Sequence, residues 1–169
     1  MKHKRLKAYL SGGMEYAHRE GMDWRKDIEI WLKKNLGHTV FNPNTESEKY
    51  LLKRKLKDEF RTLKTSDTMR FIRVVHRIVD LDSREIAAKS DYVICLWDEG
   101  AQRGAGTQGE VTIARFYKKP VYLVTEMSLT NIPGWVLGCT TKIFPSFTQL
   151  QNFLIQKYGN SRSKTKGGS

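Results

Sequence analysis

The sequence predicts an α/β fold in which a parallel sheet of about five strands is covered by helices on both faces. Short apolar runs typical of strands alternate with amphipathic helical patterns along most of the 169 residues, as in sheets with helical crossovers. One run, "DYVICLW" at residues 91–97, is apolar almost without interruption, as expected for a strand buried on both faces. The length suits one domain with its own core.

The first third of the chain is expected to form a strand, a helix and a second strand. A short strand at residues 6–10 is followed by the turn "SGG". Residues 23–36 are predicted to be helical because four apolar side chains fall on one face: Trp24, Ile28, Trp31 and Leu32. Gly37 is suited to the cap after this helix, and Pro43 stops the strand that begins at Thr39.

The middle of the chain is charged and less clearly patterned. Residues 45–62 have a helical tendency, whereas residues 63–77 are compatible with a helix or a strand. A helix is expected over "DSREIAAKS", with its N-cap at Asp82 or Ser83. The buried strand at residues 91–97 follows it.

The last third begins with a glycine-rich stretch and is expected to continue as a helix from Glu110 to Tyr117. A strand at residues 120–125, an extended piece at 142–147 and a helix at 147–159 complete the fold. We therefore expect a single domain over residues 1–159 with a basic insertion at 45–77, and a disordered basic tail at 160–169.

The net charge of +12 is unevenly distributed. Residues 49–77 carry ten basic and three acidic side chains, and most of the remaining excess lies in residues 1–7 and 160–169. Patches of this kind attract phosphates and polyanions, but they also serve as solvated surface.

Several classes of protein are not supported by the sequence. Cys95 and Cys139 show no paired pattern and are expected to be reduced thiols in a cytoplasmic protein. The four histidines are not spaced as metal ligands. The sequence has no GxxxxGK[ST] loop and no GxSxG turn, and no GxGxxG run directly follows a predicted strand. We expect no metal, no cofactor and no membrane segment, since no window approaches about 18 apolar residues.

Carboxylates near glycine-rich loops are the candidate chemical groups. Parallel sheets bind ligands beyond the carboxyl ends of their strands, where "SGGM", "NPNTE" and "WDEGAQRGAGTQGE" are expected. Glu110 ends the last of these loops, at a helix start where the macrodipole would stabilise its charge, and Asp98 and Glu99 lie earlier in it. Asp91 falls at the opposite end of its strand, which is a difficulty for a role beside Glu110.

Three segments together resemble the nucleoside 2-deoxyribosyltransferase family, which includes nucleoside 5′-monophosphate N-glycosidases. They are "AYLSGG" at 8–13, "SDYVICLW" at 90–97 and "GAGTQGEVTIARFYKKPVYLV" at 104–124. The most specific part is "GTQGE", followed by Ala114 and by Lys119–Pro120. The resemblance covers roughly residues 6–125 and implies a flavodoxin-like, Rossmann-related fold.

The resemblance also implies an enzyme that cleaves the N-glycosidic bond of a (deoxy)nucleoside or its 5′-monophosphate. Glu110 matches the nucleophile that attacks the anomeric carbon and forms a covalent glycosyl-enzyme, and the sugar then passes to another base or to water. A carboxylate can stabilise and then capture an oxocarbenium-like centre. Tyr9 and Asp91 match the family's first-strand tyrosine and the aspartate before its buried strand, so both are expected to be catalytic.

The substrate-binding residues are expected in the carboxyl-end loops: Ser11, Gly12, Gly13, Asn44, Asp98, Arg103, Gly106 and Thr107. Family members complete each site with a neighbouring subunit, so a homo-oligomer acting on a small nucleoside or nucleotide is expected.

One departure from the family pattern separates transfer from hydrolysis. Transferases often have an aspartate six residues before the nucleophile, where this chain has Gly104, beside Arg103. Hydrolysis of a nucleotide is therefore the alternative to base exchange. In that reaction Arg103 and the basic residues 49–77 would suit the phosphate of the substrate.

Other functions stay open. "RGAGTQGE" more loosely resembles a segment of the cytokinin-activating phosphoribohydrolases. A non-catalytic nucleotide sensor on the same scaffold is an alternative. Nucleic-acid binding through the basic segments is possible but not favoured, because few aromatic residues interrupt the basic runs.

Overall fold

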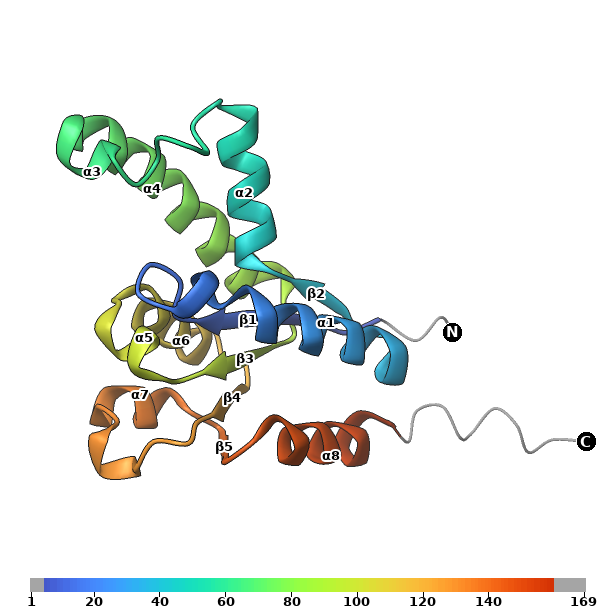
Figure 1. The fold of residues 1–169 in the computed structure, drawn as a ribbon. Helices are drawn as coiled ribbons and strands as arrows, with labels where there is room; N and C mark the ends of the chain where they lie inside the picture. Colours follow the sequence, from blue (N-terminus) through green and yellow to red (C-terminus); the bar gives the residue numbers. More distant parts are fainter. Residues whose placement is uncertain (1–4, 160–169) are drawn as a thin grey trace, which may run out of the picture.

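The order of strands in the sheet defines the fold. The computed structural model describes residues 5–159, in which all strands pair in parallel in the order β2-β1-β3-β4-β5 (Figure 1). The strands are β1 (Lys7–Gly12), β2 (Thr39–Phe41), β3 (Tyr92–Leu96), β4 (Val121–Val124) and β5 (Lys142–Phe144). This is the flavodoxin-like doubly wound order, so the predicted fold class is confirmed.

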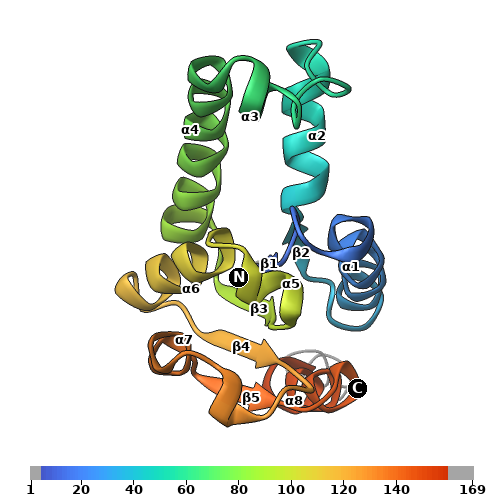
Figure 2. The same ribbon diagram turned by 60° about the vertical axis from the view of Figure 1, so that its left-hand side comes forward.

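Each face of the sheet packs against its own helices (Figure 2). Side chains alternate between the faces of a strand. In β1, β3 and β4, odd-numbered residues contribute to the cluster beneath α6 (Gly106–Phe116) and α7 (Gly134–Cys139). Even-numbered residues contribute to the cluster beneath α1 (Met22–Leu36) and α8 (Phe147–Tyr158). Both faces are therefore buried, as the apolar run at residues 91–97 predicts.

Three helices form an arm that projects beyond the sheet (Figures 1 and 2). After the edge strand β2, the chain forms α2 (Pro43–Lys53), α3 (Leu63–Ser66) and α4 (Thr68–Arg84) before returning to β3. The arm has a small apolar cluster of its own: Leu51, Leu56, Phe60, Leu63 and Val74.

The expected helix start at Asp82 or Ser83 is wrong. The ambiguous stretch at residues 63–77 is helical, and α4 begins after Asp67, whose carboxylate accepts a hydrogen bond from the Arg70 amide at 2.9 Å. The helix continues through Arg84 into a π-helical turn over Glu85–Lys89. Asp82 thus lies inside the last turn of a long helix.

Glu110 does not begin its helix. The chain becomes helical at Gly106, so Glu110 is in the second turn of α6, beyond the reach of the helix-start effect. The short helix α5 (Glu99–Arg103) and α7 were not predicted. The C-cap at Gly37 is confirmed, with a left-handed φ of 67°, and the final helix is confirmed as α8.

Other sequence expectations concern the thiols, the membrane and the tail. Cys95 and Cys139 are buried and free. No helix within residues 5–159 is long and apolar enough to cross a membrane. The tail expected to be disordered, residues 160–169, lies outside the described residues.

The loop after β1 touches α5 so closely that only glycine fits at one position. A Cβ on Gly13 would lie 2.7 Å from the backbone nitrogen of Ala101 and 2.7 Å from the carbonyl carbon of Gly100. Both neighbours are backbone atoms of a helix, so neither can move away alone.

We expect Gly13→Ala to lower the free energy of unfolding by about 1–3 kcal/mol, as overpacking does, when measured by urea denaturation. Gly109→Ala is the matched control, because the added Cβ meets no atom within 4 Å apart from its chain neighbours and its own helix backbone, and alanine should raise helix stability by about 0.5–1 kcal/mol. Equal stability of the Gly13→Ala variant and the wild type would show that the close approach is not a constraint.

Candidate active site

Two hydroxyl groups of β1 hold the carboxylate of Glu110. Tyr9 and Ser11 are two residues apart, so both point to the face of the sheet that α6 crosses. The Tyr9 hydroxyl donates to Oε1 of Glu110 at 2.9 Å, and the Ser11 hydroxyl donates to Oε2. Each carboxylate oxygen therefore accepts one hydrogen bond, and the orientation of the group is fixed.

The surroundings of Glu110 act on its pKa in opposite directions. Burial raises the pKa of Glu110, while the hydrogen bonds from Ser11 and Tyr9 and the charge of Arg25 lower it, and the net direction is upward. The side chain is still partly exposed to solvent. Burial and the nearby carboxylate also raise the pKa of Tyr9 well above its usual value, so Tyr9 stays a neutral hydrogen-bond donor.

A buried arginine fixes the loop beside this carboxylate. Arg25 of α1 is fully buried and donates to the Gly12 carbonyl at 2.8 Å. Its guanidinium also donates to four other carbonyls, those of Leu10, Gly13, Glu20 and Gly21. Backbone oxygens thus replace water around the charge, and the loop that follows β1 is held in one conformation.

Asp82 is the acidic residue that the sequence analysis missed. Burial and the charge of Glu110 raise the pKa of Asp82 to about 8. Its Oδ1 is buried without a hydrogen-bond partner among the described residues. Asp82 therefore favours its protonated form at neutral pH. It lies beside a second carboxyl, that of Glu110, and two carboxyls in different environments can serve as an acid and a nucleophile.

The pattern of α4 contains the signal that could have identified Asp82. Phe71, Val75 and Ile78 form an apolar stripe along one face of the helix, and Asp82 continues this stripe one turn further. A carboxylate at a position where the pattern requires an apolar residue indicates a functional group. The sequence alone does not reveal this stripe, because residues 63–77 are compatible with a helix or a strand.

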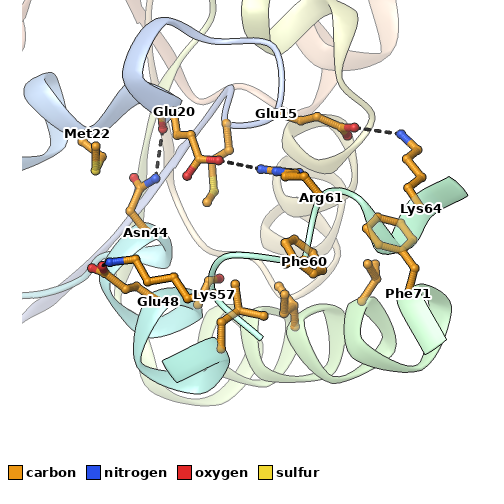
Figure 3. Close-up of a pocket in the computed structure, with 15 residues that line it drawn as sticks. Glu15, Glu20, Met22, Asn44, Glu48, Lys57, Phe60, Arg61, Lys64 and Phe71 are labelled. Atoms are coloured by element: carbon orange, nitrogen blue, oxygen red, sulfur yellow. Dashed lines mark hydrogen bonds and ion pairs between the residues drawn. The ribbon is translucent and has the colours of Figure 1, made fainter. Parts of the chain in front are cut away.

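A cavity of about 510 Å³ lies between the loop after β1 and the arm (Figure 3). Its apolar lining includes Phe60 and the stripe Phe71, Val75 and Ile78. Asp82 is the next residue on the same face of α4. Tyr9, Ser11 and Glu110 are not among the lining residues, but Met14 follows the loop after β1 and lines the cavity. The volume lies in the range of small-molecule sites.

Ion pairs cross the mouth of the cavity (Figure 3). Lys64 pairs with Glu15 at 2.7 Å, Arg61 pairs with Glu20 at 2.9 Å, and Lys57 pairs with Glu48. These side chains are exposed, so each pair contributes little to stability. Two of the pairs join the arm to Glu15 and Glu20 in the segment between β1 and α1, whereas the Lys57–Glu48 pair lies within the arm.

The other predicted binding residues lie around this cavity or in the supporting helices. Asn44 lines the cavity, and its Oδ1 is buried without a hydrogen-bond partner among the described residues. Gly12 and Gly13 form the loop that Arg25 holds. Gly106 and the buried Thr107 begin α6, one turn before Glu110.

Asp98 and Arg103 have structural contacts. Asp98 caps α5 by accepting a hydrogen bond from the Ala101 amide at 2.8 Å. The Arg103 guanidinium stacks over the ring of Tyr16 at 4.5 Å. Neither side chain lines the large cavity.

Asp91 is not brought to Glu110. It precedes β3, and its carboxylate accepts a hydrogen bond from the Lys7 amide at 2.8 Å, at the amino end of the sheet. The carboxyl ends of the strands lie at the opposite edge, so the geometry gives no support to a role of Asp91 beside Glu110, and its catalytic role stays a prediction. Within residues 5–159 there is no group of three or more histidine, cysteine, aspartate or glutamate side chains that could bind a metal ion.

Comparisons with known proteins add a distant likeness. No family model matches the chain, and no curated protein is similar to it in sequence. Among solved structures, the fold is similar to that of the CMP N-glycosidase BcmB of Clostridium botulinum, with 14% identity, a TM-score of 0.48, and 88% of this chain and 97% of that chain covered. A likeness this distant carries no argument, so the fold assignment depends on the strand order and the chemistry on the site.

We expect Ser11→Ala to raise the pKa of Glu110, because the Ser11 hydrogen bond stabilises the ionised form. Tyr9→Phe should act in the same direction with a smaller effect. Carbon-13 NMR titration of the glutamate side-chain carboxyl, assigned by comparison with Glu110→Gln, measures both shifts. A lowered pKa in either variant would contradict the proposed balance of burial and hydrogen bonding.

Proposed function

We propose that this chain is an enzyme that cleaves the N-glycosidic bond of a (deoxy)nucleoside or its 5′-monophosphate. The observation that carries the proposal is the orientation of the Glu110 carboxylate by the Tyr9 and Ser11 hydroxyls. Asp82 beside it, with a raised pKa, supplies the second carboxyl. A nucleophile and a proton donor are the two groups that glycosidic cleavage requires.

In the first step, a Glu110 oxygen attacks the anomeric carbon of the sugar. The bond between this carbon and the base breaks, its electron pair goes to the base nitrogen, and Asp82 supplies a proton to the leaving base. Ser11 and Tyr9 prevent the carboxylate from rotating, so the attacking oxygen is positioned in advance. The product of this step is a glycosyl ester of Glu110.

In the second step, water or another base attacks the same carbon and releases Glu110. The ionised Asp82 takes the proton of the attacking group, which restores both carboxyls to their starting states. The absence of the transferase aspartate, at Gly104, supports water as the acceptor.

The cavity supports a substrate with an apolar, planar part. Phe60 and Phe71 stack at 5.2 Å between ring centroids in its wall, and the unpaired Asn44 carbonyl offers an acceptor to the amino or imino group of a base. The sugar would lie between this cavity and Glu110.

Glu110→Gln should lower the release of free base by about 1000-fold or more, because an amide neither attacks nor leaves as a carboxylate does. Chromatography of incubations with deoxynucleosides, or with their monophosphates, measures the base with and without an acceptor base. Glu99→Gln, a neighbouring exposed carboxylate in α5, is the control and should retain activity. Equal turnover by the Glu110→Gln variant and the wild type would reject this nucleophile.

The pH profile should be bell-shaped. Activity requires ionised Glu110, which gives an acidic limb above the usual carboxyl range, and protonated Asp82, which gives a fall as the pH rises through about 8.

Asp82→Asn should remove the alkaline limb and lower kcat by about 100-fold or more. Asp80→Asn, on the exposed side of the same helix, should leave the profile unchanged. An alkaline limb that persists in Asp82→Asn would assign the proton donor to another group.

A further inference from the structure

A second hollow, which we call the arm groove, lies between α2 and α4 and is separate from the large cavity. It has a volume of about 340 Å³ and is lined by Arg54, Arg70, Arg73 and Arg77, with Tyr50 beside Arg54 and Val74 at its buried floor. None of these residues lines the large cavity. Figures 1 and 2 both show α2 and α4 rising together from the sheet.

The arm groove has little negative charge to balance its arginines. Within residues 5–159, Arg70 has one ion pair, with Glu59 at 3.4 Å, and the other three arginines have none. Arg70, Arg73 and Arg77 occupy one face of α4 at spacings of three and four residues, where like charges repel one another. An anion in the groove would relieve this repulsion.

The kinds of basic residue differ between the groove and the cavity mouth. Residues 49–77 contain five arginines, and four of them line the groove. Lys57, Arg61 and Lys64 at the cavity mouth are each paired with a carboxylate. The planar guanidinium suits bidentate binding of phosphate better than an ammonium does.

We propose that the arm groove binds the phosphodiester backbone of single-stranded nucleic acid. All four arginines are exposed, whereas a small-ligand site encloses most of its ligand. The three arginines of α4 span about 10 Å of the helix axis, which suits successive phosphates of a strand better than one phosphate group. A hollow between two helices admits one backbone rather than the width of a duplex.

Fluorescence anisotropy with a labelled single-stranded DNA oligonucleotide tests this proposal. We compare the wild type with Arg73→Gln/Arg77→Gln, and with Lys33→Gln/Lys34→Gln, which removes two exposed charges from α1. All three proteins keep the same basic termini, so a difference in affinity between the two variants reports the contribution of the groove arginines. Circular dichroism establishes that the variants are folded.

The groove variant should bind about tenfold more weakly at low salt. A plot of log affinity against log salt has a negative slope, and the magnitude of this slope should decrease by about 1.4, or about 0.7 for each lost phosphate contact. The α1 variant should keep the wild-type slope. Three results would overturn the proposal: no binding by the wild type, equal losses in both variants, or displacement of the oligonucleotide by inorganic pyrophosphate at an equal concentration of phosphate groups.

Discussion

The hydrogen bonds from Tyr9 and Ser11 to Glu110 are the interaction on which the site depends. A largely buried carboxylate is unfavourable unless its oxygens are satisfied, and here one β-strand supplies both donors. This geometry requires that β1 be an inner strand, with its odd-numbered face beneath α6. Burial raises the pKa of Asp82 and the negative charge of Glu110 raises it further, so the proposed nucleophile helps to keep the proposed acid protonated.

A second buried charge maintains this arrangement from the opposite side of the sheet. Arg25 has no carboxylate in hydrogen-bond contact within the described residues, and five backbone carbonyls surround it instead. Because those carbonyls belong to β1 and to the loops that precede α1, the guanidinium connects the conformation of the loop to the position of Ser11. Its charge also lowers the pKa of Glu110, which favours the ionised form.

The sequence predicted the parts of the structure that depend on short-range pattern. The apolar run at residues 91–97 identified an inner strand, and "GTQGE" identified Glu110, whose partners Tyr9 and Ser11 came from the first strand. Asp82 was missed because its meaning depends on where α4 begins. Asp91 lies at the end of its strand opposite to Glu110, as its place in the sequence indicates, and there its carboxylate accepts a hydrogen bond from the Lys7 amide. The arm groove depends on packing between α2 and α4, which a charge count along the chain does not show. The expected homo-oligomer stays a prediction.

The most direct test of the central claim is peptide mapping by mass spectrometry after incubation with a 2′-fluoro-substituted nucleoside or its 5′-monophosphate. Fluorine at this position destabilises the oxocarbenium-like transition states, so a glycosyl ester should accumulate. The account predicts a sugar adduct on the peptide that contains Glu110, and no adduct in Glu110→Gln. Release of base from the unmodified substrate without any adduct, or an adduct on another residue, would contradict covalent catalysis by Glu110.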